Sequence, residues 1–527
     1  MRLRYYGIPL FVILTFTVLV SSCKDDWNNH YSADAANKSK LNLYQYIQSQ
    51  SDLSTFTGML KSTGYDTVLT KTQTYTVWAP NNQALASVDL TDTALVRKIV
   101  KNHITRFSHT SSGVISKTIL MLDNKLIIFA KGASGYSFGG KTIVQSDVAV
   151  ANGILYVLSD YAPYKMNIWE FLSNTPGIDS IRSYVINDLT ISQIDTAASF
   201  KDGIFVSTVY KSTNKALTYL GQFKTEDSTY TAIIPNNAAW TEAYNRILPY
   251  FNTLAIDGGA TTQMKNTKWT LIQDLFFRGK QTLPIPADSL FSTYGHGFAN
   301  PNRLFNGAQM TELSNGLSYV TGQLQNNATE SWFKEIRVEA ESSRIGRLTS
   351  NYSATSVSSI GTGYNISQGN YLRLDPTTSS SLSKLYVTFP IANTLSAKYN
   401  IYCVFVPASI VDTSDHRPYQ VQFYLSYTNN LGVPVIFGSV DVNNTVQLPS
   451  KTSYTFTTTP SNQPQKMLVV SGFQFPFCNL VNSKDYISSL LPTVTLKVQN
   501  AGTPANETAK KVNRTLRIDC IILEPVQ

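Results

Sequence analysis

Charged residues and cysteine are both scarce in this chain of 527 residues. Charged side chains make up 15% of the sequence, and the basic ones are scattered rather than clustered among aromatics, which argues against a nucleic-acid surface. The chain has no Gly-x-Ser-x-Gly elbow, no Walker loop, no His-Glu-x-x-His and no paired-cysteine zinc motif, and its five histidines lack metal-ligand spacing. These absences predict a noncatalytic protein that binds no nucleic acid.

The first apolar run, residues 8–20, is too short to cross a bilayer as a helix, which takes about 20 residues. It follows Arg2 and Arg4 and has the length of a signal-peptide core. The run ends in Leu-Val-Ser-Ser before Cys23, which resembles the lipobox of bacterial lipoproteins. The resemblance implies a signal peptide over residues 1–22 and an acylated Cys23 that anchors the chain durably. An ordinary signal peptide with a chance cysteine is the alternative.

The residues after this cysteine are Lys24, Asp25 and Asp26. They resemble the short acidic tag that sends some Gram-negative lipoproteins to the outer face of the outer membrane. We therefore expect residues 23–42 to be a tether and the folded mass to face the cell exterior. A solvated linker on a protein of the periplasmic face is the alternative.

The remaining three cysteines, Cys403, Cys478 and Cys520, all lie in the last quarter of the chain. An exported protein could form one disulfide and leave one thiol over, but each cysteine is equally compatible with a small buried hydrophobe. A hydrophobic content of 43% and an aromatic content of 12% can build sizeable cores. The length corresponds to about three to four domains.

One short pattern occurs twice. Residues 74–85 and 229–240 each contain an alternating apolar strand that ends in Pro-Asn-Asn and leads into a helix-forming start. Proline cannot continue a strand ladder, and asparagine is a favoured helix N-cap. The two copies are one domain length apart, so the sequence predicts two repeats of a strand-turn-helix module.

The first copy resembles the first signature motif of fasciclin domains, and other landmarks follow in order. Residues 99–104 look like the central helix with its histidine, His103, and residues 147–158 match the second motif, a strand, Asn152-Gly153 and a second strand. The resemblance covers residues 43–165 and implies an α+β adhesion module without catalysis. We expect His103, Asn152 and Gly153 to have structural roles.

The second copy, over residues 166–328, is degenerate. Its helix at residues 271–276 is predicted to place Asp274 where the first domain has His103. Segments 251–268 and 284–306 look like insertions. We expect these residues to form a second fasciclin-like domain. The sequence does not indicate whether this domain keeps the binding function of the family.

From residue 330 onward, short strands alternate with Ser, Thr, Asn and Gly turns, which predicts an all-β sandwich over 330–527. Its first and last strands resemble those of the galactose-binding-like jelly rolls used as carbohydrate-binding modules. In that family these strands pair, and nearby carboxylates often hold a structural calcium; here they would be Glu339, Glu341 and Asp519. Acids that merely face solvent at strand ends are the alternative.

A glycan site in such a domain would need an exposed aromatic ring beside polar groups. The Gly-rich loop that ends in Tyr364 and Asn365 is the predicted location. Other aromatic side chains near turns or strand edges are also candidates: Trp332, Tyr352, Tyr371 and Tyr419.

Three functions fit this organisation. The first is a surface lipoprotein that binds a polysaccharide as an accessory to a starch-utilisation-type importer complex. The second is an adhesive or structural lipoprotein whose fasciclin domains bind a protein. The third is a scaffold in which no domain binds a soluble ligand.

Overall fold

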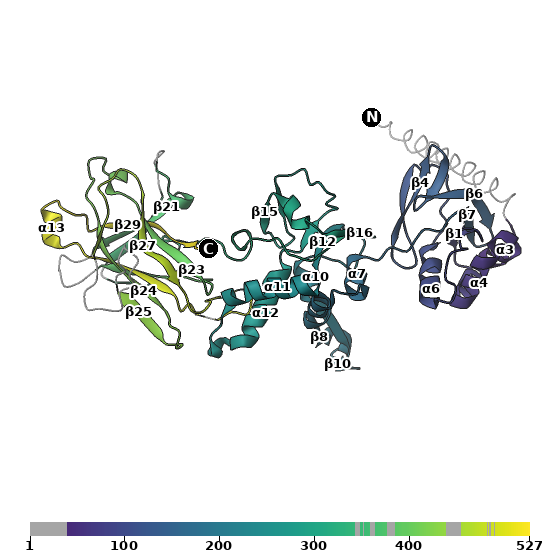
Figure 1. Ribbon diagram of the computed structural model, residues 1–527, viewed down its shortest axis with the longest axis horizontal. Coiled ribbons are helices and arrows are strands. Elements are labelled where there is room, and N and C mark those ends of the chain that lie inside the picture. The colour runs from purple at the N-terminus through teal and green to yellow at the C-terminus, as the bar shows by residue number, and fades with distance from the viewer. Residues whose placement is uncertain are drawn as a thin grey trace, which may run out of the picture. The chain divides into compact units, whose positions relative to one another are not determined.

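The computed structural model describes residues 39–342, 348–350, 352–358, 364–376, 385–438, 455–481, 483, 486–489 and 491–527 (Figure 1). Contacts divide the chain into two compact units. One comprises Met1–Phe171, Phe223–Ser228 and Glu312–Asn315, and the other comprises Leu172–Gln222, Thr229–Thr311 and Gly316–Gln527. Within the described part, no helix has the length and apolar character needed to span a membrane.

The first domain packs helices against a seven-stranded sheet of order β2-β1-β7-β6-β5-β4-β3. Strands β1 (Tyr75–Pro80) and β7 (Gly153–Leu158) run parallel. Apolar side chains from the helices pack on these two strands and form the main core. The other elements are α3 (Leu43–Ser49), η1 (Ser51–Leu53), α4 (Ser54–Thr63), α5 (Tyr65–Leu69), α6 (Thr93–Asn102), β2 (Ile104–Arg106), β3 (Ser116–Leu120), β4 (Leu126–Gly132), β5 (Gly135–Phe138) and β6 (Lys141–Val150).

The second domain repeats this plan with a four-stranded sheet of order β13-β12-β17-β16. Its parallel pair is β12 (Tyr230–Pro235) with β17 (Gly316–Thr321). The other elements are α7 (Ile168–Asn174), α8 (Asp179–Arg182), η2 (Ser183–Asp188), β8 (Thr190–Ile194), α9 (Thr196–Ser199), β9 (Phe200–Lys201), β10 (Ile204–Phe205), β11 (Tyr210–Asn214), α10 (Lys215–Tyr219), α11 (Asn237–Ile247), η3 (Leu248–Phe251), η4 (Ala255–Asp257), α12 (Gly259–Ile272), β13 (Phe276–Arg278), β14 (Ser289–Phe291), β15 (Gly297–Ala299), η5 (Pro301–Phe305), β16 (Gln309–Leu313) and η6 (Ala328–Glu330).

The Pro-Asn-Asn motif ends its strand in both repeats. Asn236 caps α11 by accepting a hydrogen bond from the amide of Ala239, at 2.9 Å. Asn81 accepts the equivalent bond from Ala84, also at 2.9 Å, but residues 82–87 form turns rather than a helix. The helical prediction is therefore right for the second repeat and wrong for the first.

The Asn-Gly pair has the same role in both domains. The side chain of Asn152 accepts from the amide of Leu43 and donates to the carbonyls of Leu69 and Lys71, with all three distances between 2.7 and 2.8 Å. Asn315 makes the same three-way connection at 2.9 Å, and its partners are the amide of Ile168 and the carbonyls of Phe223 and Thr225. Each asparagine thus ties the opening helix to the segment before the parallel strand.

The glycine of each pair permits a close strand approach. A Cβ atom on Gly153 would lie 2.0 Å from the carbonyl oxygen of Tyr75, and one on Gly316 would lie 1.8 Å from that of Tyr230. Any side chain at either position would push the parallel strands apart.

The predicted equivalence of Asp274 with His103 is wrong by one residue. The amide of Trp78 donates to His103, and the equivalent amide of Ile233 donates to Leu275. Asp274 therefore corresponds to Asn102, the residue before the histidine. The end of the helix is a poor reference for alignment, because α6 ends at Asn102, one residue before His103, whereas α12 ends at Ile272, three residues before the equivalent Leu275.

The expected insertions and one further segment differ from the first domain. Segment 251–268 contains η4 and most of α12, and segment 284–306 contains the β14–β15 hairpin and η5. The further segment, which sequence reasoning missed, is the β8–β11 hairpin with the smaller β9–β10 hairpin at its end. Its side chains are largely exposed. Figure 1 labels two of its strands, β8 and β10.

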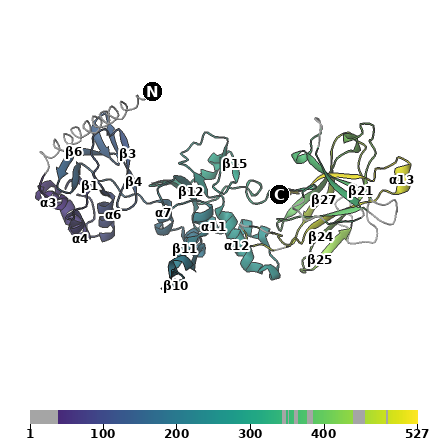
Figure 2. The same ribbon diagram turned by 180° about the vertical axis from the view of Figure 1, so that it is seen from behind.

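The C-terminal region is a sandwich of two sheets, visible from both sides (Figure 1 and Figure 2). Sheet one has the order β20-β21-β29-β23-β27, with β18 also paired to β29; sheet two has the order β19-β22-β28-β24-β25, with β26 also paired to β24. The strands are β18 (Ile336–Glu339), β19 (Leu348–Ser350), β20 (Tyr352–Ser358), β21 (Asn370–Pro376), β22 (Tyr386–Pro390), β23 (Lys398–Phe405), β24 (Gln420–Thr428), β25 (Pro434–Gly438), β26 (Phe456–Thr457), β27 (Gln465–Gln474), β28 (Thr495–Asn500) and β29 (Leu516–Pro525). Short helices η8 (Ser367–Gly369), η9 (Ala408–Ile410) and α13 (Pro504–Thr508) lie between strands.

The predicted pairing of first and last strands is present, with Glu339 of β18 opposite Cys520 of β29. The fold class expected from the sequence, two fasciclin-like α+β domains followed by an all-β sandwich, is confirmed.

The three cysteines of the sandwich region are free thiols. Burial raises the pKa of Cys478 to about 11 and that of Cys520 to about 12, and it raises the pKa of Cys403 well above its ordinary value. Cys403 and Cys520 are buried and behave as small hydrophobes, which was one of the two expectations, whereas Cys478 is half-buried.

Candidate functional site

The fasciclin histidine is part of the core. His103 is fully buried; its Nδ1 lies 2.7 Å from the carbonyl oxygen of Ile99, and its Nε2 accepts from the amide of Ala162 at 3.0 Å. Burial lowers the pKa of this imidazole to about 4, so it is neutral at physiological pH. Its role is to join two segments of the chain, as expected.

A buried lysine stabilises the first unit. Lys125 is 4% exposed, and its Nζ lies 2.7 Å from Glu170, 3.0 Å from Glu226 and 3.1 Å from the hydroxyl of Ser314. Burial opposes ionisation of Glu170, but hydrogen bonds from Lys125 and Tyr164 outweigh it and lower the pKa of that carboxyl. The sequence offered no sign of this cluster, because its members are far apart in the chain.

The outward face of sheet two carries an ordered set of polar and aromatic side chains. Antiparallel register places Thr388, Lys497 and Tyr424 in one row across three neighbouring strands. The adjacent row contains Tyr386, Gln499 and Gln422. Alternate residues of the same strands, such as Val387, Val498 and Phe423, are buried in the sandwich core.

These side chains contact one another. The Nζ of Lys497 lies 4.3 Å from the ring centre of Tyr386 and 4.9 Å from that of Tyr424. The amide of Gln499 donates to Gln422 at 3.0 Å, and the hydroxyl of Tyr424 donates to the same oxygen at 3.3 Å. The two rings, the two amides and the ammonium are therefore contiguous, and we call this set the tyrosine–lysine face. Tyr386, Tyr424 and Lys497 are half-buried, whereas Gln422 and Gln499 are buried.

Two of the three predicted calcium residues, Glu339 and Asp519, lie together, whereas Glu341 is not part of their group. The hydroxyl of Ser367 donates to Glu339 at 2.6 Å, and its amide contacts both carboxylate oxygens of Asp519, at 3.1 and 3.2 Å. One donor atom each from Glu339, Asp519 and Cys520 lies within 4.8 Å of the others. The thiol of Cys520 was not predicted, because its role depends on strand pairing.

The electrostatics of this cluster favour a cation. Burial, followed by the charges of Glu339 and Glu341, raises the pKa of Asp519 to about 6 despite its bonds to Ser367. The second carboxylate oxygen of Glu339 is buried and has no hydrogen-bond partner within the described residues. Oxygen donors of this kind suit Ca²⁺, whereas the protonated thiol of Cys520 is not a ligand that Ca²⁺ prefers.

The two residues predicted for the glycan site, Tyr364 and Asn365, differ in their exposure to solvent. Asn365 is exposed, but the Tyr364 ring packs against the apolar cluster of Ile366, Tyr371 and Val406, and its hydroxyl lies 3.3 Å from the carbonyl of Ser409. Three other aromatic candidates, Trp332, Tyr371 and Tyr419, are buried. The side chain of Tyr352 is outside the described residues, as are residues 359–363 of the predicted loop.

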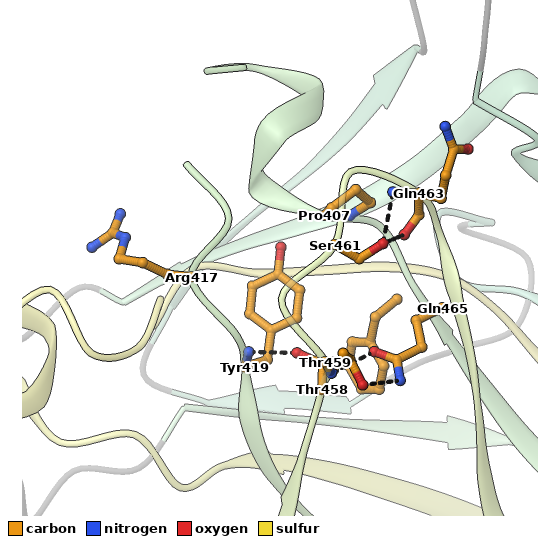
Figure 3. Close-up of a pocket in the computed structure, with 9 residues that line it drawn as sticks. Pro407, Arg417, Tyr419, Thr458, Thr459, Ser461, Gln463 and Gln465 are labelled. Atoms are coloured by element: carbon orange, nitrogen blue, oxygen red, sulfur yellow. Dashed lines mark hydrogen bonds between the residues drawn. The ribbon is translucent and has the colours of Figure 1, made fainter. Parts of the chain in front are cut away.

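A shallow hollow lies near the sandwich edge, between Arg417, Tyr419 and Gln465 (Figure 3). Its polar groups already bond to one another: the amide of Thr459 donates to Gln465 at 2.9 Å, and the amide of Tyr419 donates to Thr458 at 2.7 Å. Satisfied groups leave little hydrogen-bonding capacity for a ligand. Gln422 and Gln499 of the tyrosine–lysine face are also bonded to each other, but that face adds two half-buried rings and the Lys497 ammonium, which makes it the better binding candidate.

The predicted lipidation residue Cys23 and the export tag Lys24, Asp25 and Asp26 lie outside the described residues.

Comparison with known proteins identifies part of the chain. No curated protein matches the sequence at a significant level. The chain is similar to the FAS1 domain pair of the insect cell adhesion molecule fasciclin I, with 12% identity and a TM-score of 0.21 over 53% of this chain and 98% of that one. It is also similar to the CBM22-1 and GH10 modules of a Clostridium thermocellum endo-1,4-β-D-xylanase, with 10% identity and a TM-score of 0.22 over 36% of this chain and 28% of that one. Residues 51–161 match the fasciclin domain family, so the chain contains a nonenzymatic module of the adhesion type.

Proposed function

We propose that this protein is a noncatalytic surface lipoprotein that binds glycan on the tyrosine–lysine face. The observation that carries the proposal is the contiguity of the half-buried Tyr386 and Tyr424 rings with the Lys497 ammonium, on the face of sheet two opposite the sandwich core. Aromatic rings offer rigid apolar area to the C–H groups of a sugar, and an ammonium donates hydrogen bonds to its hydroxyls. The fasciclin-like domains would hold this face away from the membrane.

A glycan-array screen of the full-length protein tests the proposal. We expect binding to at least one polysaccharide class, and we expect the double substitution Tyr386→Ala and Tyr424→Ala to weaken it by about tenfold or more, since about 1.4 kcal/mol corresponds to tenfold. Tyr364→Ala is the matched control, because that ring belongs to a separate apolar cluster. The proposal fails if no glycan binds the folded protein, or if only the Tyr364 variant loses affinity; the second outcome would support the Tyr364–Asn365 site.

The proposal includes a structural calcium ion. Glu339, Glu341 and Asp519 would hold the ion, whose positive charge would stabilise carboxylates that otherwise repel one another. Ca²⁺ takes about 6–8 oxygen ligands, so backbone carbonyls and water would complete the shell. Isothermal titration of Ca²⁺ into the protein and into the Asp519→Asn variant measures this site directly, and equal heats from both would exclude it.

The membrane location and the importer are further parts of the proposal. Acylation of Cys23 would anchor the chain, and the residues Lys24, Asp25 and Asp26 would direct it to the cell exterior. Cys23→Ser should release the protein from the membrane fraction, and protease added to whole cells should digest the wild type if it faces outward. Co-purification with an outer-membrane importer tests the accessory role.

The alternative is an adhesion protein with a protein partner, which two observations favour. Residues 51–161 match an adhesion family, and the β8–β11 hairpin exposes large apolar side chains, among them Ile204 at 71% and Tyr210 at 65%. Exposed apolar patches of this kind often mark protein contacts. Loss of a pulled-down partner after deletion of the hairpin, with glycan binding absent, would support this reading.

A further inference from the structure

We infer that the tyrosine–lysine face selects an acidic polysaccharide, whose uronate carboxylate pairs with Lys497. The inference rests on the proposed glycan-binding function and adds the chemical class of the ligand. Three features carry it: the position of the lysine, the absence of acids from the described strands of its sheet, and the contrast with the other sheet.

Lys497 lies at the centre of the face. Strand β28 has β22 on one side and β24 on the other, and each neighbour contributes one tyrosine ring near the ammonium. Cation–π attraction holds the ammonium on the surface without neutralising its charge. Its N–H donors thus remain available to a carboxylate, and the flexible four-carbon stem can adjust to the ligand.

The described strands of sheet two carry charge of one sign only. Among the six strands that the structure describes in this sheet, Lys497 is the one charged residue. The side chains around it are tyrosine, glutamine and threonine, which are neutral at physiological pH. An acidic sugar would meet a complementary positive charge and no nearby repulsion from these strands.

Sheet one shows the contrasting arrangement. Lys466 of β27 also lies over a tyrosine ring, 4.2 Å from the centre of Tyr402, but it forms an ion pair with Glu524. Arg373 is likewise paired with Asp375, at 2.9 Å. Lys466 and Arg373 are thus neutralised within the protein, whereas Lys497 has no acid on the described strands of its own sheet. An external carboxylate is the partner that this difference predicts.

Matched polysaccharides test the inference. The probes are polygalacturonate, alginate and unsulfated chondroitin, each beside its carboxyl-reduced form, which keeps the sugar backbone but replaces the uronate with an alcohol. The proteins are the full-length wild type, Lys497→Met, Lys497→Arg and the control Lys466→Met. Binding is measured by affinity electrophoresis and isothermal titration, at low and at high salt.

We expect the wild type to bind at least one acidic polymer about 10- to 100-fold more tightly than its reduced form, the range of a charge-assisted hydrogen bond. The preference should shrink in high salt. Lys497→Met should abolish the preference for the acidic polymer, Lys497→Arg should keep most of it, and Lys466→Met should behave as wild type.

The other outcomes separate the two proposals. Equal binding to acidic and reduced polymers, or a preference that survives Lys497→Met, would overturn the inference and leave glycan binding intact. Binding to neutral glycans alone would likewise overturn the inference and leave the proposed glycan binding intact. Failure to bind any glycan would overturn the proposed function together with the inference.

Discussion

Removal of the buried Lys125 ammonium should destabilise the first unit strongly. Methionine nearly preserves the side-chain volume, so Lys125→Met removes the charge and leaves little cavity. Glu226, whose side chain is 6% exposed, would then be buried without its cation. Loss of one member of a buried ion pair costs about 3–5 kcal/mol. Glu170 adds less, because its side chain is 34% exposed and retains some hydration.

The free energy of unfolding can be measured from hydrogen exchange of the β1 and β7 amides in urea, since these strands report on this unit. Lys165→Met is the matched control: it removes an ion pair with Glu312 whose side chains are 45% and 50% exposed, and it should cost less than about 1 kcal/mol. The double variant Lys125→Met with Glu226→Gln should recover part of the loss. If Lys125→Met costs no more than Lys165→Met, the cluster does not stabilise the unit as reasoned here.

Three further predictions concern the repeats and the carboxylate cluster. Gly316→Ala should destabilise the second domain by about 3 kcal/mol, because its Cβ would collide with the Tyr230 carbonyl; denaturant unfolding checks this, and exposed Gly58→Ala, with no atom within 4 Å of its added Cβ, should be neutral or stabilising. Asn152→Ala should cost about 3 kcal/mol, since three buried backbone groups lose their partner, and unchanged exchange in residues 65–71 would contradict it. Folding raises the pKa of Asp519 to about 6, so in chelator the wild type should lose stability as pH rises from about 4 through 6. Asp519→Asn should remove that loss, and parallel pH profiles of the two proteins would contradict the linkage.

Local patterns predicted the architecture because the signals were short-range. The Asn-Gly pair lies at the tight turn between β6 and β7, and the proline ends its strand, so both could be recognised in the sequence. The hydrogen bonds of Asn152 to Leu43, Leu69 and Lys71 join segments far apart in the chain and could not. The pairing of β18 with β29 was predicted because the sequences of these two strands resemble the first and last strands of the jelly-roll family. Boundaries that depend on tertiary packing were less legible: residues 82–87 form turns although Asn81 makes the expected capping bond.

The candidate site was harder to predict for the same physical reason. Tyr386, Tyr424 and Lys497 come from three separate strands, and antiparallel register alone brings them together. Sequence reasoning favoured Tyr364 because it follows glycines, yet its ring is held by an apolar cluster. Glu339 and Asp519 were found because their strands carried a recognisable motif. A residue whose role depends on register needs the sheet before it can be identified.

The free cysteines of the sandwich region have a practical consequence. Cys403 and Cys520 are fully buried, and burial raises the pKa of both thiols and of Cys478, so the reactive thiolate is rare at neutral pH. Since no disulfide joins these three residues, reductant should leave the fold unchanged, and the domain can mature in a reducing or an oxidising compartment. A cysteine introduced on the tyrosine–lysine face would react with a maleimide far faster than these three. A fluorophore could thus be attached beside the proposed binding surface without first removing any native cysteine of the sandwich.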